Sequence, residues 1–107
     1  SRGSRMSVFH GNTFIGQRIQ VDGHEFSNNI FQNCVLVYGG GPLTMRDNVL
    51  QSVRWEFVDS AARTAALLAS FYQGGGEGKK FVEFLLSTYG KAVEAPTAQN
   101  AGATAGQ

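Results

Sequence analysis

The chain has 107 residues, of which 42% are hydrophobic, 16% are charged and 11% are aromatic, and its formal net charge is +1. This length predicts one domain rather than two, and the near-neutral charge argues against a protein that binds nucleic acid by electrostatic attraction. A single cysteine excludes an internal disulfide, and no apolar stretch reaches the roughly 20 residues that a membrane-spanning helix needs. Since no signal peptide is recognisable either, we expect a cytoplasmic protein without nucleic-acid or membrane partners.

The two ends of the chain differ in composition from its middle. Residues 1–5 precede Met6 and resemble a scar left by an expression vector. Residues 92–107 are mostly alanine, glycine, threonine and amide residues, which lack the apolar area needed to offset the entropy lost on ordering. We therefore expect a single α+β domain over residues 6–91 and a low-complexity tail over residues 92–107.

An internal repeat occupies the middle of the sequence. Large apolar residues recur every five positions in two sets that are offset by 19 residues, namely Phe26, Phe31 and Leu36, then Met45, Leu50 and Trp55. Amide side chains recur with the same offset, Asn29 with Asn48 and Gln32 with Gln51. Because apolar and amide positions repeat together, we interpret residues 25–38 and 44–57 as two copies of one structural unit.

The five-residue period suits a chain that alternates short extended segments with tight corners. Asparagine and aspartate tolerate the left-handed backbone that such corners require. They stand between the apolar positions at Asn28-Asn29, Gln32-Asn33 and Asp47-Asn48. A shorter echo of the spacing, Phe14 and Ile19, precedes the two copies, so we expect two or three coils over residues 7–58. An ordinary antiparallel sheet built from the same strands stays the competing fold, because alternation alone cannot separate the two.

The two copies differ on the outer face of their last strand. The strand at residues 53–57 places charged residues there, whereas the strand at residues 34–38 places Val35 and Val37 there. An apolar outer face needs cover, and a strand edge without charge or proline invites pairing with another chain. We therefore predict that Val35 and Val37 are interface residues of a homo-oligomer, in the first instance a dimer.

The pattern Phe-x-Asn-x-x-Phe-x-Asn-Cys at Phe26–Cys34 resembles the pentapeptide-repeat proteins. In that family the chain winds into a right-handed, four-sided β-solenoid. The order of repeat, Leu-Val-Tyr-Gly-Gly turn, second repeat, alanine-rich helix and glycine-rich loop resembles a family of small bacterial proteins from environmental and mobile-gene-cassette sequences. The resemblance implies a short β-solenoid-like fold of two or three coils. The acidic surface with which long members imitate DNA is absent here, so that function does not carry over.

The composition changes abruptly after Val58. An alanine-rich segment predicts a helix over residues 60–72, and a second apolar stripe predicts another over residues 78–89 that ends at Gly90. Stacked repeats need caps at their ends. We therefore expect these helices to close the open end of the coils or to cover their free face.

No residues form a recognisable catalytic motif. The segment Gly74–Lys80 lacks the spacing of a phosphate-binding loop, and Cys34 falls on the inward phase of the repeat, as a buried hydrophobe would. Asp22, His24 and Glu25 surround a predicted turn, but they make a poor metal site without a further ligand. We therefore expect neither a metal nor another cofactor.

Aromatic residues favour a binding role. We predict Tyr38, Trp55, Phe57 and Tyr72 as ligand-binding residues, provided that they line a cleft between the coils and the helices.

Two functional hypotheses follow from the sequence. The leading one is a non-enzymatic module that acts through self-assembly or through binding of a partner. The rival is a small-ligand-binding protein or a minor enzyme, with its site near Asp22, His24 and Glu25 or around Tyr38 and Trp55.

Overall fold

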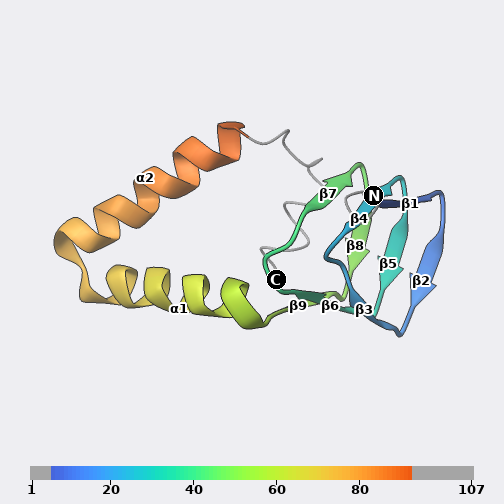
Figure 1. Cartoon of the computed structure of the whole chain (residues 1–107), viewed down its shortest axis with the longest axis horizontal. Helices are drawn as coiled ribbons and strands as arrows, with labels where there is room; N and C mark the ends of the chain where they lie inside the picture. The colour runs from blue at the N-terminus through green and yellow to red at the C-terminus, as the bar shows by residue number, and fades with distance from the viewer. Residues whose placement is uncertain (1–5, 93–107) are drawn as a thin grey trace.

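The computed structural model describes residues 6–92. Within this range nine short strands precede two helices, the α+β order that the sequence predicts (Figure 1). The strands are β1 (Ser7–His10), β2 (Thr13–Ile15), β3 (Arg18–Gln20), β4 (His24–Ser27), β5 (Ile30–Gln32), β6 (Val35–Tyr38), β7 (Leu43–Arg46), β8 (Val49–Gln51) and β9 (Arg54–Phe57). The helices are α1 (Asp59–Gly74) and α2 (Gly76–Ala92). Across the described range, neither helix has the length and hydrophobicity that a membrane crossing requires.

The strands form three sheets of identical arrangement. In the described part of the chain each sheet has three parallel strands, in the orders β1-β4-β7, β2-β5-β8 and β3-β6-β9. Three consecutive strands thus supply one strand to each sheet, and we call such a set a round. Parallel pairing excludes the competing antiparallel sheet. The three sheets also contrast with the four sides that the family resemblance implies, because the connection after β3 is too short to hold a fourth strand.

The strand register confirms the repeat. Phe26 lies beside Met45, Phe31 beside Leu50 and Leu36 beside Trp55. The first round is a third copy with an offset of 17 residues, since Phe14 lies beside Phe31 and Ile19 beside Leu36. The two additional residues of the second round fall between β6 and β7, in the segment that contains the three consecutive glycines.

The corners of the rounds use a left-handed backbone. The corner residues are Gly11, Asn28 and Asp47 after the first strands, and Gly16, Asn33 and Ser52 after the second strands, with φ between 55° and 73°. Glycine, asparagine and aspartate are the residues that tolerate this conformation, so the predicted corners are confirmed. Ser52 is the exception, because serine has no such preference, and it occupies the position in the third round that Asn33 occupies in the second.

Side chains from all three sheets meet in one core. Its buried members are Val21, Phe26, Phe31, Cys34, Leu36 and Leu50. Equivalent rings stack between rounds, with ring centroids 5.3 Å apart for Phe9 and Phe26 and 5.0 Å apart for Phe14 and Phe31. Cys34 is a buried free thiol, as its inward position in the repeat predicts.

Two buried asparagines join consecutive rounds. Asn29 accepts a hydrogen bond from the Asn12 backbone N–H at 2.8 Å and donates its amide N–H to the Phe9 carbonyl at 3.0 Å. Asn48 accepts from the Asn29 backbone N–H at 2.9 Å and donates to the Phe26 carbonyl at 3.1 Å. Each buried amide therefore satisfies backbone groups of the preceding round, which would otherwise be buried without partners.

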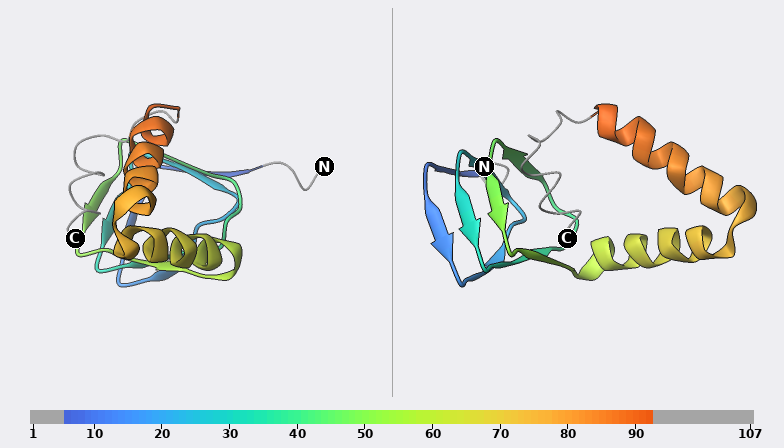
Figure 2. Two further views of the ribbon diagram at one scale, coloured as in Figure 1. Left: turned by 90° about the vertical axis from the view of Figure 1, so that its left-hand side faces the viewer. Right: turned by 180° about the vertical axis from the view of Figure 1, so that it is seen from behind.

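The helices form a hairpin that stands off from the rounds (Figures 1 and 2). α1 begins directly after β9, packs against that strand only at its start, and otherwise packs against α2. Among the described residues of the hairpin, none in α1 and only Val82 in α2 is buried. The expectation that the helices cap the coils is therefore wrong, because their closest packing is with each other.

The helix ends differ slightly from the sequence prediction. Gly75 and Gly76 have φ of 69° and 58° and separate the helices, whereas α2 continues through Gly90. Gly90 does not end the helix, because it does not adopt the left-handed backbone that ends helices at glycine. The expected tail begins within α2 at Ala92, and its remaining residues lie outside the described residues, as do residues 1–5.

Candidate functional site

The predicted interface valines lie on the outer face of the sheet β3-β6-β9. Val37 is only 4% exposed and Val35 is half-buried. Arg18 of β3 forms an ion pair with Glu56 of β9, and the register places these residues on either side of the two valines, so the pair passes over β6. Val37 is therefore already covered within one chain, and the interface role of Val35 and Val37 stays a prediction.

Asp22, His24 and Glu25 do not converge on one site. The His24 ring packs on the core, with its centroid 5.8 Å from that of Phe26, whereas Glu25 belongs to the opposite face of β4. Among residues 6–92, no three histidine, cysteine, aspartate or glutamate side chains group in a way that could hold a metal ion.

Asp22 instead connects two turns. Its carboxylate accepts hydrogen bonds from the backbone N–H groups of Gly39 at 2.8 Å and Gly41 at 2.6 Å, and from the Gln20 amide. Burial by itself raises the pKa of Asp22, but the hydrogen bonds from Gly41, Gly39 and Gln20 outweigh burial and lower that pKa below its ordinary value. The carboxylate therefore holds the glycine segment that leads from β6 to β7.

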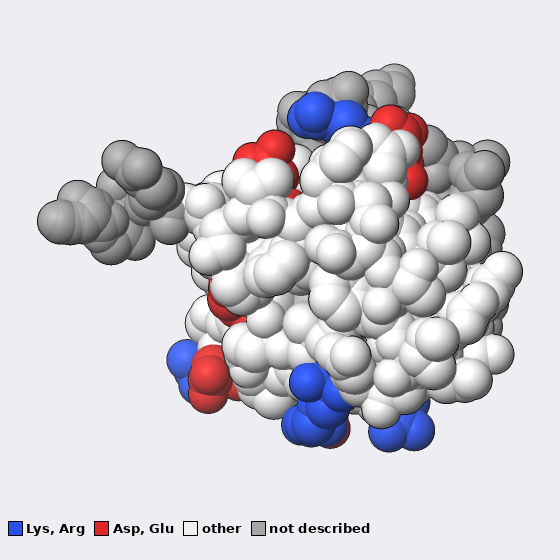
Figure 3. Space-filling view, turned by 90° about the vertical axis from the view of Figure 1, so that its right-hand side faces the viewer, with Lys and Arg blue, Asp and Glu red and all other residues white. Residues whose placement is uncertain are grey.

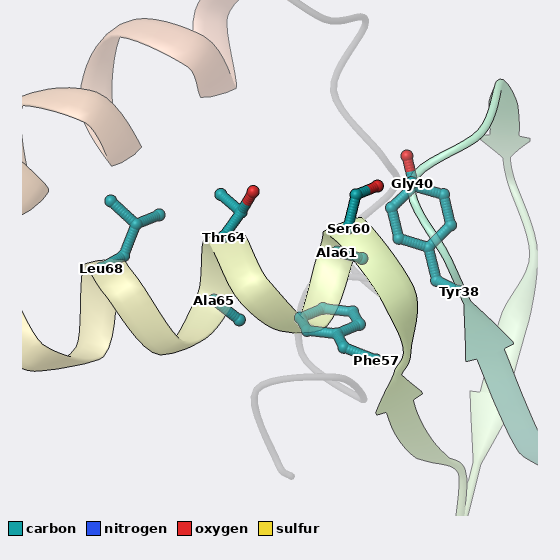
Figure 4. Close-up of a pocket in the computed structure, with 8 residues that line it drawn as sticks. All are labelled: Tyr38, Gly40, Phe57, Ser60, Ala61, Thr64, Ala65 and Leu68. Carbon is teal, nitrogen blue, oxygen red and sulfur yellow. The ribbon is translucent and has the colours of Figure 1, made fainter.

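A pocket lies where α1 leaves β9, and we call it the junction pocket (Figure 4). Its volume is about 400 Å³, and it is lined by Tyr38, Gly40, Phe57, Ser60, Ala61, Thr64, Ala65 and Leu68. The rings of Tyr38 and Phe57 meet edge to face with centroids 6.1 Å apart, because the two residues are neighbours in the β6–β9 register. Two of the four predicted ligand-binding residues thus share this pocket.

The junction pocket offers little polar chemistry. None of its eight lining residues is charged. The Tyr38 hydroxyl donates to the Gly41 carbonyl at 2.8 Å, and the Ser60 hydroxyl donates to the Gly39 carbonyl at 3.0 Å. Of the three hydroxyl groups that line the pocket, those of Tyr38 and Ser60 are thus engaged, and only that of Thr64 is left as a side-chain donor, so the pocket suits a largely apolar group.

A larger hollow separates the two helices, and we call it the hairpin groove. Its volume is about 730 Å³, and it is lined by Thr64, Leu67, Leu68, Phe71, Phe81, Leu85, Leu86, Tyr89 and Gly90. Near the turn it is closed by the edge-to-face contact of Phe71 and Phe81, whose centroids are 6.0 Å apart. Leu67, Leu86 and Tyr89 are each more than half exposed.

One face of α1 joins the two hollows. Thr64 and Leu68 line both, and the residues of this face, which follow each other at intervals of three or four, are Ala61, Thr64, Ala65, Leu68 and Phe71. This spacing is typical of a helix that packs against a partner. We call the uncharged surface formed by the junction pocket, this face and the hairpin groove the hairpin face.

No family model, curated protein or solved structure matches the chain. Its function has to be argued from its surfaces.

The other two predicted ligand-binding residues lie elsewhere. Trp55 packs at the margin of the core, with its indole N–H buried and without a hydrogen-bond partner among the described residues. Tyr72 is outside both hollows, and the Lys79 ammonium lies 5.2 Å from its ring centroid. The sequence prediction missed the helical part of the site, although the three- and four-residue spacing from Ala61 to Phe71 could have revealed it.

Proposed function

We propose that this chain is a non-enzymatic module that acts by self-association, and that two copies pack through their hairpin faces. The observation that carries this proposal is the hairpin face itself, which extends uncharged from the junction pocket across α1 to α2. Soluble proteins rarely leave continuous apolar surface of this kind uncovered.

Three features favour a second copy as the occupant of the hairpin face. An uncharged face needs no oppositely charged partner, and closed two-fold symmetry is the commonest arrangement of homo-oligomers. Ala61 and Ala65 are small, so a second helix can approach α1 closely. The sequence after Ala92 contains one large aliphatic residue, Val93, among residues 93–107, which is too little apolar area to cover the groove.

We further propose that the three rounds are a short β-solenoid of the pentapeptide-repeat type, with the hairpin as its assembly element. The repeating register, the left-handed corners and the buried amides that join the rounds support this. Kinship with the mobile-gene-cassette proteins stays a prediction.

Light scattering coupled to size exclusion tests the self-association. At micromolar concentration the unmutated protein should have at least twice the chain mass of 11.5 kDa. Leu68→Glu combined with Leu85→Glu should at least halve the measured mass, because it places charge in the hairpin face. Ala66→Glu, an exposed position on the opposite side of α1, is the matched control and should leave the mass unchanged. A monomeric unmutated protein, or a double variant of unchanged mass, would overturn the proposal.

The junction pocket favours a second candidate function, the binding of a small aromatic ligand against the Tyr38 and Phe57 rings, on the side that faces α1. Thermal unfolding with indole and p-cresol tests this, because a ligand stabilises the state that it binds. We expect a saturable rise in Tm that disappears in Ala65→Phe, whose ring would fill the pocket. No shift, or an equal shift in the variant, would exclude ligand binding at this position.

A further inference from the structure

The end of the stack opposite the hairpin is an open, uncharged surface. Within residues 6–92, β1, β2 and β3 have a neighbouring strand on one side only, so each exposes a sheet edge. Viewed from this end, the centre of the surface carries no charged side chain, and the charges lie at its rim (Figure 3).

Charged side chains and prolines, two of the devices that protect sheet edges, are scarce in the first round. Arg18 is the one charged residue between Ser7 and Gln20, and its guanidinium is paired with Glu56 of the third round. The first round also contains no proline. Charged side chains and prolines are the usual means by which edge strands avoid pairing with other chains.

Apolar side chains at this end lack the cover that their counterparts have. Phe9, Phe14 and Ile19 are partly buried, whereas the residues at the same positions of the second round are fully enclosed. Val8 and Ile15 beside them are exposed. The first round therefore has the composition of an inner layer and the position of an outer one.

Asn12 supplies the most specific sign that a further layer fits here. It occupies the position of Asn29 and Asn48 in the first round, and those two asparagines reach back to backbone groups of the round before them. The Asn12 side chain is exposed and forms no hydrogen bond within residues 6–92. Its amide therefore offers one acceptor and two donor hydrogens toward whatever covers this end.

We propose that the first-round end is a second docking face, on which another copy of this chain places its own first-round end. A two-fold axis perpendicular to the stack sets the opposing edge strands antiparallel, so backbone N–H and C=O groups can pair across the interface. Because an amide is both donor and acceptor, two Asn12 side chains that face each other across the two-fold axis can each donate a hydrogen bond to the other. The absence of charge favours an identical partner over a charged one.

This interface is independent of the hairpin dimer, because it lies at the opposite end of the rounds. A chain with two separate self-complementary faces builds assemblies larger than a dimer. The two faces can therefore be disrupted one at a time.

The test uses the Leu68→Glu/Leu85→Glu chain, in which the hairpin face is disrupted. We expect this variant to remain a dimer through the first-round end by light scattering. Adding Asn12→Asp should then give a monomer, with the dimer dissociation constant raised at least tenfold, since facing carboxylates repel and cannot donate. Asn12→Asp should preserve the fold, because the Asn12 side chain has no partner within the described chain. Ala66→Glu adds the same charge away from both faces and should have no effect.

Ile15→Lys is a second variant, which adds a charge at the rim of the same end, on the outer face of β2, and it keeps the proposal testable if Asn12→Asp fails to fold. A monomeric hairpin variant that still carries Asn12 would overturn the first-round interface while leaving the hairpin dimer intact. It would also be overturned if neither Asn12→Asp nor Ile15→Lys changed the mass of the Leu68→Glu/Leu85→Glu chain. A monomeric chain that binds a peptide or another protein at this end would overturn it as well. If the hairpin variant keeps the full wild-type mass and Asn12→Asp alone halves it, the first-round interface stands and the hairpin proposal fails.

Discussion

The rounds and the hairpin are both rich in large apolar residues, but they bury them very differently. Phe31, in the second round, is 0% exposed, whereas Phe84, in α2, is 63% exposed. The rounds enclose their own core because three sheets face one another and buried amides satisfy the backbone between layers. Within residues 6–92 the hairpin has two elements and no third layer, so one apolar face stays open. We therefore expect the rounds to supply most of the stability of the chain, whereas the hairpin contributes mainly a surface for assembly.

The largest test of this contrast compares two phenylalanines. Phe31→Ala should lower the free energy of unfolding by about 3–5 kcal/mol, because it leaves a cavity in an enclosed core. Phe84→Ala should change it by less than about 0.5 kcal/mol, since the side chain is exposed. Urea unfolding followed by circular dichroism measures both values. Losses of equal size would show that the hairpin phenylalanine is as well packed as the core one.

The buried amides provide the next largest effect. Asn48→Leu removes the partners of the Asn29 N–H and the Phe26 carbonyl, and we expect a loss of about 2–4 kcal/mol from two buried backbone groups left without hydrogen bonds. Gln51 bonds Gln32 on the exposed surface, so Gln51→Leu should cost less than about 0.5 kcal/mol. The same unfolding measurement applies. A loss below about 1 kcal/mol for Asn48→Leu would mean that the buried amides contribute little beyond the sheet hydrogen bonds and the apolar packing.

The hydrogen bonds of the Asp22 carboxylate to the glycine segment between β6 and β7 are expected to have the next largest effect. Asp22→Asn should lower the free energy of unfolding by about 1–2 kcal/mol at neutral pH, because hydrogen bonds to a charged acceptor are the stronger ones. The pKa of Asp22 is lowered on folding, so its stabilisation is complete above the ordinary value of 3.8 and disappears as pH falls through the folded-state pKa. The difference between wild type and variant should therefore shrink in acid. A difference that is constant with pH would assign the effect to packing.

The smallest expected effect lies at the junction of the two regions. Gly40 has φ of 108°, and a Cβ atom there would collide with the Ser60 hydroxyl that bonds the Gly39 carbonyl. Gly40→Ala should therefore lower the free energy of unfolding by about 1 kcal/mol, from backbone strain together with displacement of the Ser60 hydroxyl. Gly74→Ala, at a helical position with open space around it and outside both hollows, is the control and should not lower it. Equal effects of the two substitutions would show that the junction tolerates a side chain.

The rounds were largely predictable because their structure repeats. Spacing and amide positions recur locally, so Phe26, Phe31 and Leu36 identified their partners in the next round. Asn12 was overlooked, because the first round has a shorter offset and fewer matching residues around it. The left-handed backbone at Ser52 could not be predicted, because serine has no preference for that conformation.

The surfaces were harder to predict because they depend on contacts between distant residues. The ion pair that covers Val37 joins strands from the first and third rounds, and alternation along one strand cannot reveal it. Tyr38 and Phe57 meet because they share a register position, whereas Tyr72 lies one helix away. An apolar stripe on a helix shows that cover is needed but does not show what supplies it.

The backward direction of the buried amides has a consequence for synthesis on the ribosome. The Asn29 amide that bonds the Phe9 carbonyl is synthesised 20 residues after it, and the Asn48 amide that bonds the Phe26 carbonyl is synthesised 22 residues after it. At translation rates of about 5–20 residues per second, each delay lasts on the order of one to four seconds. During that interval the carbonyls of the emerging layer lack the amide partners that they have in the folded chain. Layers are therefore expected to become stable in order from the N-terminus, each one only after its successor has left the exit tunnel.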